Sequence, residues 1–198
     1  CIVQGNQLTL APDTEVGGLA SLGARMVKGA GFIVQVPTID IAEVGAGGGS
    51  IAAIDAAGGM LVGPRSAGAE PGPICYDRGG TQPTVTDANL LLGYLNPESL
   101  VGGDLKLNYQ NAEAALVELG ARLGLSAIET AYGIHLIANA NMMRALQAVT
   151  SERGRDPSHF SLFAMGGNGG VHAGNLAESL NVQRIIVPPV AGLFSALG

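Results

Sequence analysis

The fold class is decided by residues 160–187, FSLFAMGGNGGVHAGNLAESLNVQRIIV. The stretch Phe160–Met165 is apolar and strand-like, and residues 166–170 after it are glycine apart from one asparagine. The stretch His172–Leu180 reads as a helix, and Arg184–Val187 reads as a second strand. A strand, a glycine loop, a helix and a strand in this order indicate an α/β fold.

The loop at 166–170 is one of two candidate anion sites. The free N–H groups and the positive dipole end at the start of the following helix would favour a nucleotide. A close packing turn between strand and helix explains the glycines equally well. An acidic residue about twenty positions further on would complete a dinucleotide fingerprint, but Pro188-Pro189 stand there, so an NAD fold is disfavoured.

The second candidate is the loop GAGGGS at residues 45–50. Glycines permit a close approach of the backbone, and successive N–H groups can converge on an anion, with the Ser50 hydroxyl beside them. We favour anion contact over a tight turn between buried strands, because four glycines in six residues exceed what a turn needs. No Gly-Lys-Ser/Thr follows, so this is not a Walker A motif. Residues 50–55 and 60–62 read as a hairpin around Gly58-Gly59, which argues against a dinucleotide fold.

Two carboxylates are the candidate catalytic residues. Asp40, like Glu43, precedes the first glycine loop and is placed to act there, for instance through Mg²⁺, with surface solvation as the alternative. Asp87 could hold a metal or polarise water, although a helix cap is its simpler local role. His172 could contact a phosphate or a base, or simply end a turn. Cys75 has no evident histidine partner, so a catalytic thiolate is a minority interpretation.

Local signals predict the remaining elements. Residues 2–10 read as a hairpin turning at Gly5-Asn6, with further strands near 33–36 and 37–41. Thr86-Asp87 can cap a short helix over 88–95, and a second helix is expected over Tyr109–Leu123. Ser126 and Glu129 form a capping-box pattern at the start of a long helix that runs to about Glu152.

Composition argues against several classes of partner, and the two ends of the chain indicate a fragment. The net charge is −6 with only two lysines, so nucleic acid and anionic membranes are poor partners. The apolar stretch 127–149 contains charged and amide residues, which argues against a membrane span. Two cysteines without a disulfide framework suggest a reducing cytoplasm. Because the chain starts at Cys1 and stops at Gly198 in an apolar stretch, we expect it to be a piece of a longer protein.

The chain resembles the hydantoinase A / 5-oxoprolinase family. The resemblance rests on four stretches that occur in the family's order and span nearly the whole chain. They are residues 40–52, residues 63–76, residues 83–93, and residues 165–173 together with 187–198. By this resemblance residues 1–198 form one hydantoinase A-type domain that lacks its N-terminal part. Its sections would be a strand-rich part (1–62), a Gly/Pro-rich loop with a short helix (63–108), a helical part (109–153) and the strand–loop–helix–strand unit (154–198).

The resemblance also implies a fold and a nucleotide site. The family is similar to the actin-like (ribonuclease H-like) ATPases, whose two α/β lobes clamp a nucleotide, and this chain would be the second lobe with a family-specific insertion. The phosphate and substrate side would be lined by Gly45, Gly47, Gly48, Gly49 and Ser50. The adenosine side would be lined by Gly166, Gly167, Gly169 and Gly170. Asn168 and Gly170 stand where the family commonly has Ala and Pro.

The implied chemistry depends on ATP and Mg²⁺. Phosphorylation of an amide oxygen would allow water to open a cyclic amide such as a hydantoin or 5-oxoproline, with a hydantoinase B-type subunit completing an oligomeric enzyme. An ATP-dependent ketone carboxylase is the first alternative. A nucleotide-binding or assembly module without chemistry of its own is the second. The metal ligands are not predicted.

Overall fold

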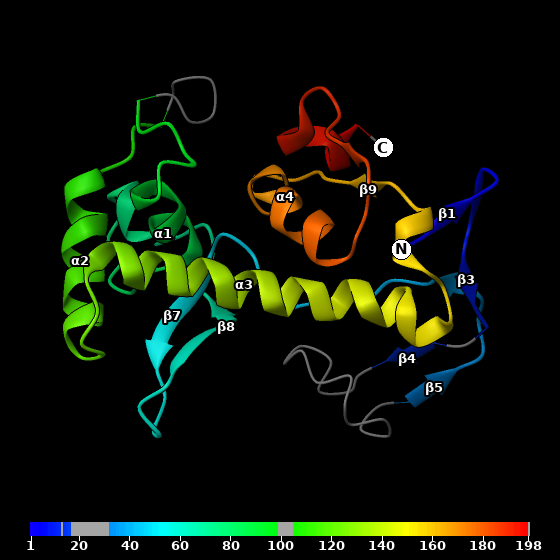
Figure 1. Ribbon diagram of the computed structural model, residues 1–198, viewed down its shortest axis with the longest axis horizontal. Helices are drawn as coiled ribbons and strands as arrows, with labels where there is room; N and C mark the ends of the chain where they lie inside the picture. The colour runs from blue at the N-terminus through cyan, green and yellow to red at the C-terminus, as the bar shows by residue number, and fades with distance from the viewer. Residues whose placement is uncertain (13, 17–31, 99–104, 198) are drawn as a thin grey trace.

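The computed structural model describes residues 1–12, 14–16, 32–98 and 105–197, and the long helix α3 (Ala127–Val149) organises them. The helices α1 and α2 and the hairpin β7–β8 pack at the N-terminal half of α3 (Figure 1). Helix α4 lies over its middle, and the strands near the N-terminus of the chain lie at its far end. The bounds of the smaller helices are Val85–Leu91 for α1, Tyr109–Ala121 for α2 and Gly169–Ser179 for α4.

Every sheet among the described residues has two strands. Strands β1 (Val3–Gln4) and β2 (Gln7–Leu8) form the predicted hairpin, in which Gly5 and Asn6 both have positive φ, as a type I′ turn requires. The other antiparallel pairs near the N-terminus join β3 (Leu10–Ala11) with β6 (Thr38–Ile39), and β4 (Thr14–Val16) with β5 (Phe32–Val34).

The hairpin β7 (Ser50–Ile54) and β8 (Met60–Ser66) is also confirmed. The carboxylate of Asp55 stabilises its turn by accepting hydrogen bonds from the backbone N–H groups of Ala57 and Gly59, both at 2.9 Å. Strand β8 runs on to Ser66, so the glycine- and proline-rich loop expected from residue 63 begins later. Pairing of Ser50 with Ser66 across a register shift explains this extension.

The core lies between the hairpin and three helices, and it contains apolar side chains from all of them. Its buried residues are Ala52, Val62, Val85, Ala88, Leu91, Leu116, Leu119, Ala131, Ile134 and Ala138. Helix α3 starts with the predicted capping box between Ser126 and Glu129, but it ends at Val149, where a 3₁₀ turn (Ser151–Arg153) replaces the expected last α-helical turn.

The prediction for the start of α1 was wrong by three residues. The cap is Thr84, whose hydroxyl accepts a hydrogen bond from the Asp87 N–H, and Asp87 is the third helical residue rather than the cap. The capping box was missed because Thr84 and Thr86 are both good caps, and the sequence alone does not choose between them.

The strand–loop–helix–strand unit is confirmed. Strands β9 (Leu162–Phe163) and β10 (Ile185–Ile186) are parallel, and α4 connects them. Helix α4 begins at Gly169 instead of near His172, since glycine is a poor helix former and the prediction placed both last glycines in the loop.

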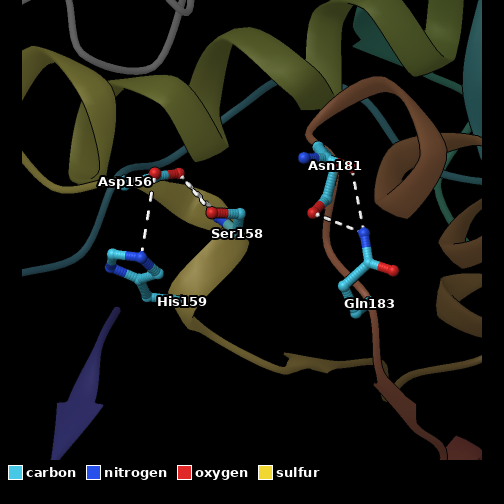
Figure 2. A network of polar contacts seen from close by, with 5 residues as sticks. All are labelled: Asp156, Ser158, His159, Asn181 and Gln183. Carbon is cyan, nitrogen blue, oxygen red and sulfur yellow. Dashed lines mark hydrogen bonds and ion pairs between the residues drawn. The ribbon is translucent and has the colours of Figure 1, made fainter.

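Side chains fix the turns that lead into β9 and β10 (Figure 2). The Asp156 carboxylate accepts hydrogen bonds from the N–H and hydroxyl of Ser158, which lowers the pKa of Asp156. The Gln183 side chain donates to the side-chain and backbone oxygens of Asn181. Among the described residues, no helix is long and apolar enough to cross a membrane.

Candidate functional site

The first glycine loop is closed by the side chain of Ser50. Its hydroxyl accepts a hydrogen bond from the Gly47 N–H at 2.9 Å and donates one to the Gly45 carbonyl at 3.4 Å. Ser50 is buried, with 4% of its surface exposed. The hydroxyl predicted to face a ligand is therefore engaged within the loop in this structure, where it holds the backbone in shape.

The glycines of this loop serve two different purposes. A Cβ on Gly45 would lie 2.6 Å from Pro64 Cβ, and one on Gly49 would lie 2.8 Å from Ser66 Oγ, so these two allow the loop to pack on β8. A Cβ on Gly47 would meet no atom within 4 Å in the part of the chain that the structure describes, apart from its chain neighbours. Both interpretations of the loop thus have support, since it is a packed turn that leaves open space over Gly47.

The second glycine loop leads into an uncapped helix. Asn168 occupies the N-cap position of α4 but makes no side-chain cap hydrogen bond. Among the described residues, chain neighbours aside, no atom lies within 4 Å of a Cβ placed on Gly166, Gly167 or Gly170, and Gly166 has a φ of +87° that favours glycine. The start of α4 therefore combines open space with a helix N-terminus that its N-cap side chain does not cap, while the Val171 N–H donates to the Asn168 carbonyl at 3.1 Å. Such a helix start suits an anion.

The two glycine loops meet at Thr86, near the start of α1. The Thr86 N–H donates to the Gly48 carbonyl at 2.9 Å, and the Asn168 side-chain amide donates to the Thr86 hydroxyl at 3.3 Å. A Cβ on Gly48 would overlap the Asn168 amide and would lie 2.7 Å from Thr86 Oγ1, so a side chain there would displace this contact. Segments that are far apart in the chain thus form one surface. Thr86 and Asn168 were not among the predicted site residues, and no spacing in the sequence signals their meeting.

This junction predicts a coupled pair of substitutions. We expect Gly48→Ala to push the Asn168 amide off Thr86 and to destabilise the protein by about 1–2 kcal/mol, as modest overpacking does. Asn168→Ala removes the overlap with the amide but leaves Thr86 Oγ1 at 2.7 Å from the added Cβ. Both single variants lose the contact between Asn168 and Thr86, so the double variant should lose less than the sum of the two. A double-mutant cycle on urea unfolding measures this, and strictly additive effects would contradict the junction.

Asp87 is fully buried and its carboxylate is saturated. One oxygen accepts from the Cys75 N–H at 2.7 Å, and the other accepts from the Ile74 N–H and from the N–H and hydroxyl of Thr84. The carboxylate thereby ties the loop that contains the 3₁₀ turn Ile74–Tyr76 to the start of α1. Burial, and then the charge of Asp87, raise the pKa of the Cys75 thiol above its usual range, so Cys75 is a neutral thiol here.

Asp40, the other candidate catalytic carboxylate, lies near the turn that follows α3. It is 2% exposed and forms an ion pair with Arg153, in the turn after α3, while its N–H donates to the Thr9 carbonyl. Within the described part of the chain, the ion pair and the hydrogen bond of Asp40 lead to Arg153 and Thr9 and not to Asp87 or either glycine loop. The catalytic roles of the two carboxylates stay predictions, and the structure does not bring them together.

An apolar cavity of about 260 Å³ adjoins the second glycine loop. It lies between α3, α4, β9 and residues 42–44, and Met142, Phe163, Met165, Gly169 and His172 are among its lining residues. His172 is buried and belongs to α4, so it does not end a turn. Its two ring nitrogens lie within hydrogen-bond distance of Asn89 and Asn139, and its ring stacks on that of His135 at 4.8 Å.

Comparison with known proteins identifies the family. The family model described as Hydantoinase/oxoprolinase matches residues 2–198. The chain belongs to the hydantoinase/oxoprolinase family. Over 84% of its length it is 46% identical to caprolactamase subunit alpha of Pseudomonas jessenii, and over 84% it is 46% identical to the acetophenone carboxylase gamma subunit of Aromatoleum aromaticum.

Two solved structures of this family share the fold. The crystal structure of ATP-dependent caprolactamase from Pseudomonas jessenii has a TM-score of 0.78 at 45% identity, covering 84% of this chain and 24% of that one. Nucleotide-free acetone carboxylase has a TM-score of 0.82 at 30% identity, covering 96% of this chain and 25% of that one. The chain spans about a quarter of the length of these hydantoinase/oxoprolinase relatives, with 24% and 23% of the two subunits matched in sequence.

Proposed function

We propose that this chain provides one wall of the nucleotide site of an ATP-dependent enzyme that opens cyclic amides, in the second lobe of an actin-like ATPase fold. The observation that supports it most is the junction of the two glycine loops at Thr86, with open space over Gly47 and Gly167. The matched caprolactamase, which is described as ATP-dependent, supports the nucleotide and the amide substrate.

The residues of this surface fit a nucleotide. The start of α4 has no side-chain cap from Asn168 and would present its first N–H groups to a phosphate, and the open space over Gly47 and Gly167 lets phosphate oxygens approach the backbone. The cavity beside Gly169 has the apolar lining that a base prefers. Bound ATP would supply the phosphoryl group that makes an amide oxygen a good leaving group. The residues here would bind and orient it, while Ser50 and Asp87 keep the loop and α1 in shape.

The proposed Mg²⁺ has no evident ligands in this chain. Among the described residues, no group of three or more His, Cys, Asp or Glu is placed to hold a metal ion. Both Asp87 oxygens already accept hydrogen bonds from backbone groups, and the side chain is fully buried, so it does not face the open space of the site. We therefore assign no metal ligand here. A hydantoinase B-type subunit is the proposed partner, consistent with the naming of both relatives as subunits.

A ketone carboxylase subunit is the second candidate, because identity to the acetophenone carboxylase gamma subunit equals that to caprolactamase. A module that binds nucleotide without chemistry is the third. Turnover separates the three. We expect the intact enzyme with its partner subunit to release phosphate from ATP faster when a lactam, a hydantoin or 5-oxoproline is added. A requirement for a ketone and bicarbonate would favour the carboxylase, and nucleotide binding with no stimulated hydrolysis would favour the module.

A further inference from the structure

A chain of amide and imidazole side chains is buried where α1, α3 and α4 meet. His135 Nδ1 lies 2.9 Å from Asn89 Oδ1, and the amide nitrogen of Asn89 lies 3.3 Å from His172 Nε2. His172 Nδ1 lies 2.6 Å from Asn139 Oδ1. His135, His172 and Asn89 are each at most 1% exposed. Most polar groups buried this deeply are hydrogen-bonded, and in this chain of side chains the Asn139 amide nitrogen is the buried group that has no hydrogen-bond partner among the described residues.

The Asn89 amide fixes the proton on both rings. Its oxygen can only accept, so His135 donates from Nδ1–H; its nitrogen can only donate, so His172 accepts at Nε2 and carries its proton on Nδ1. His172 then donates to Asn139 Oδ1. The Asn175 amide, on α4, donates to His135 Nε2 at 3.3 Å. Each ring is therefore neutral, and a second proton on His172 would face the N–H₂ group of Asn89.

These contacts connect the two glycine loops by a second route. Asn89 lies in α1, three residues after Thr86, and His172 lies in the first turn of α4, three residues after Gly169. We propose that Asn89, His135 and His172 are positioning residues that hold the second glycine loop in register with the first, and that they do so only while both imidazoles are neutral. The consequence for nucleotide binding rests on the function proposed above, whereas the coupling of α1 to α4 does not.

The surroundings of the stack favour the neutral rings. Tyr94 faces the stack, with a ring centroid 5.1 Å from that of His135, and Cys1 lines the same cavity as His172. No acidic or basic side chain contacts the stack in the part of the chain that the structure describes. Burial, and then the neighbouring His135, lower the pKa of His172 to about 4. Burial also lowers the pKa of His135.

The sign of the pH effect follows from that shift. We call the structure described here the closed state, and a state in which this network is broken and the His172 ring is solvated the open state. In the open state the pKa of His172 is near 6.5. Between about pH 6.5 and 4 the open state therefore binds more protons than the closed state. The contribution of His172 is complete above pH 6.5 and is lost as the pH falls toward 4. Protonation of His172 in the open state therefore increases the population of that state about tenfold when the pH is lowered from 7.5 to 5.5.

Hydrogen exchange of the intact protein, read by mass spectrometry, tests the proposal. His172→Leu removes both ring contacts, whereas His172→Gln keeps one donor and one acceptor but cannot titrate. We expect His172→Leu to lower the protection of residues 169–179 at least tenfold relative to residues 109–121 in α2, and His172→Gln to restore most of it. After correction for intrinsic rates, wild-type protection of α4 should fall about tenfold from pH 7.5 to 5.5, and this fall should shrink in His172→Gln.

A matched control lies on the same helix as His135. Asn141→Ala removes the hydrogen bond from the Asn141 amide to the Val62 carbonyl, outside the network, and should leave α4 protected. Unchanged protection of α4 in His172→Leu, or an equal loss in α2, would overturn the positioning role. If the protection of α4 depended on pH equally in the wild type and in His172→Gln, the role of His172 protonation would be overturned.

Calorimetry of Mg·ATP with the same variants separates this inference from the proposed function. Weaker binding in His172→Leu together with selective loss of α4 protection supports both. Selective loss of protection in a wild-type protein that binds no nucleotide would support the positioning role and sink the proposed function. If His172→Leu left the protection of α4 unchanged while nucleotide binding stayed normal, the proposed function would be supported and the positioning role overturned.

Discussion

Asp87→Asn should lower the free energy of unfolding by about 3 kcal/mol, because it turns an acceptor oxygen of a buried carboxylate into a donor group. Each Asp87 oxygen accepts at least one backbone N–H, so either orientation of the amide opposes a donor with a donor. The hydrogen bonds to Ile74 and Cys75 also hold the Gly/Pro-rich loop against α1. The urea midpoint of the intact protein measures the loss.

Asp55→Asn is the matched control for this substitution. Asp55 also accepts two backbone N–H groups, through a single oxygen, but it lies on an exposed turn. The asparagine introduced there can keep its side-chain oxygen on the same two donors, so we expect a change within about 1 kcal/mol. If Asp87→Asn had the same urea midpoint as Asp55→Asn but had lost ATP turnover, the organising role would be contradicted. The catalytic role predicted from sequence would then be the better account.

Elements specified by local chemistry could be predicted from the sequence. The Ser126–Glu129 capping box, the turn at Gly5-Asn6 and the hairpin around Gly58-Gly59 depend on residues within a few positions of one another, and all three are present. Boundaries were less predictable where neighbours compete, as at the start of α1. The start of α4 was misplaced because its first residues are glycines whose helical state depends on packing.

The organisation of the candidate site could not be predicted. Thr86 and Asn168 are 82 residues apart, and Asn89 and His172 are 83 apart, so their contacts arise only from how α1, α3 and α4 pack. The sequence does contain one signal of these contacts. His135 and Asn139 are four residues apart on the apolar side of α3, and paired polar residues on a buried helix face indicate partners on another element. Ser50 and Asp87 were identified from the sequence as polar residues near a loop. The sequence does not show that their side chains already hydrogen-bond to the backbone of the protein itself.

Gly47→Val is expected to raise the dissociation constant for Mg·ATP at least about tenfold, or 1.4 kcal/mol. Gly47 has open space where a Cβ would lie, so the fold should tolerate valine while its side chain fills the volume proposed for phosphate oxygens. Gly174→Val is the matched control, because Gly174 also has open space but lies in α4, five residues beyond the helix start.

Calorimetric titration of Mg·ATP into the intact wild-type protein and these two variants tests the central claim most directly. Our account predicts binding by wild type and Gly174→Val that is weakened or lost in Gly47→Val, with all three equally stable to urea. Equal binding by all three, or no binding by the wild type, would contradict a nucleotide site at the junction of the glycine loops.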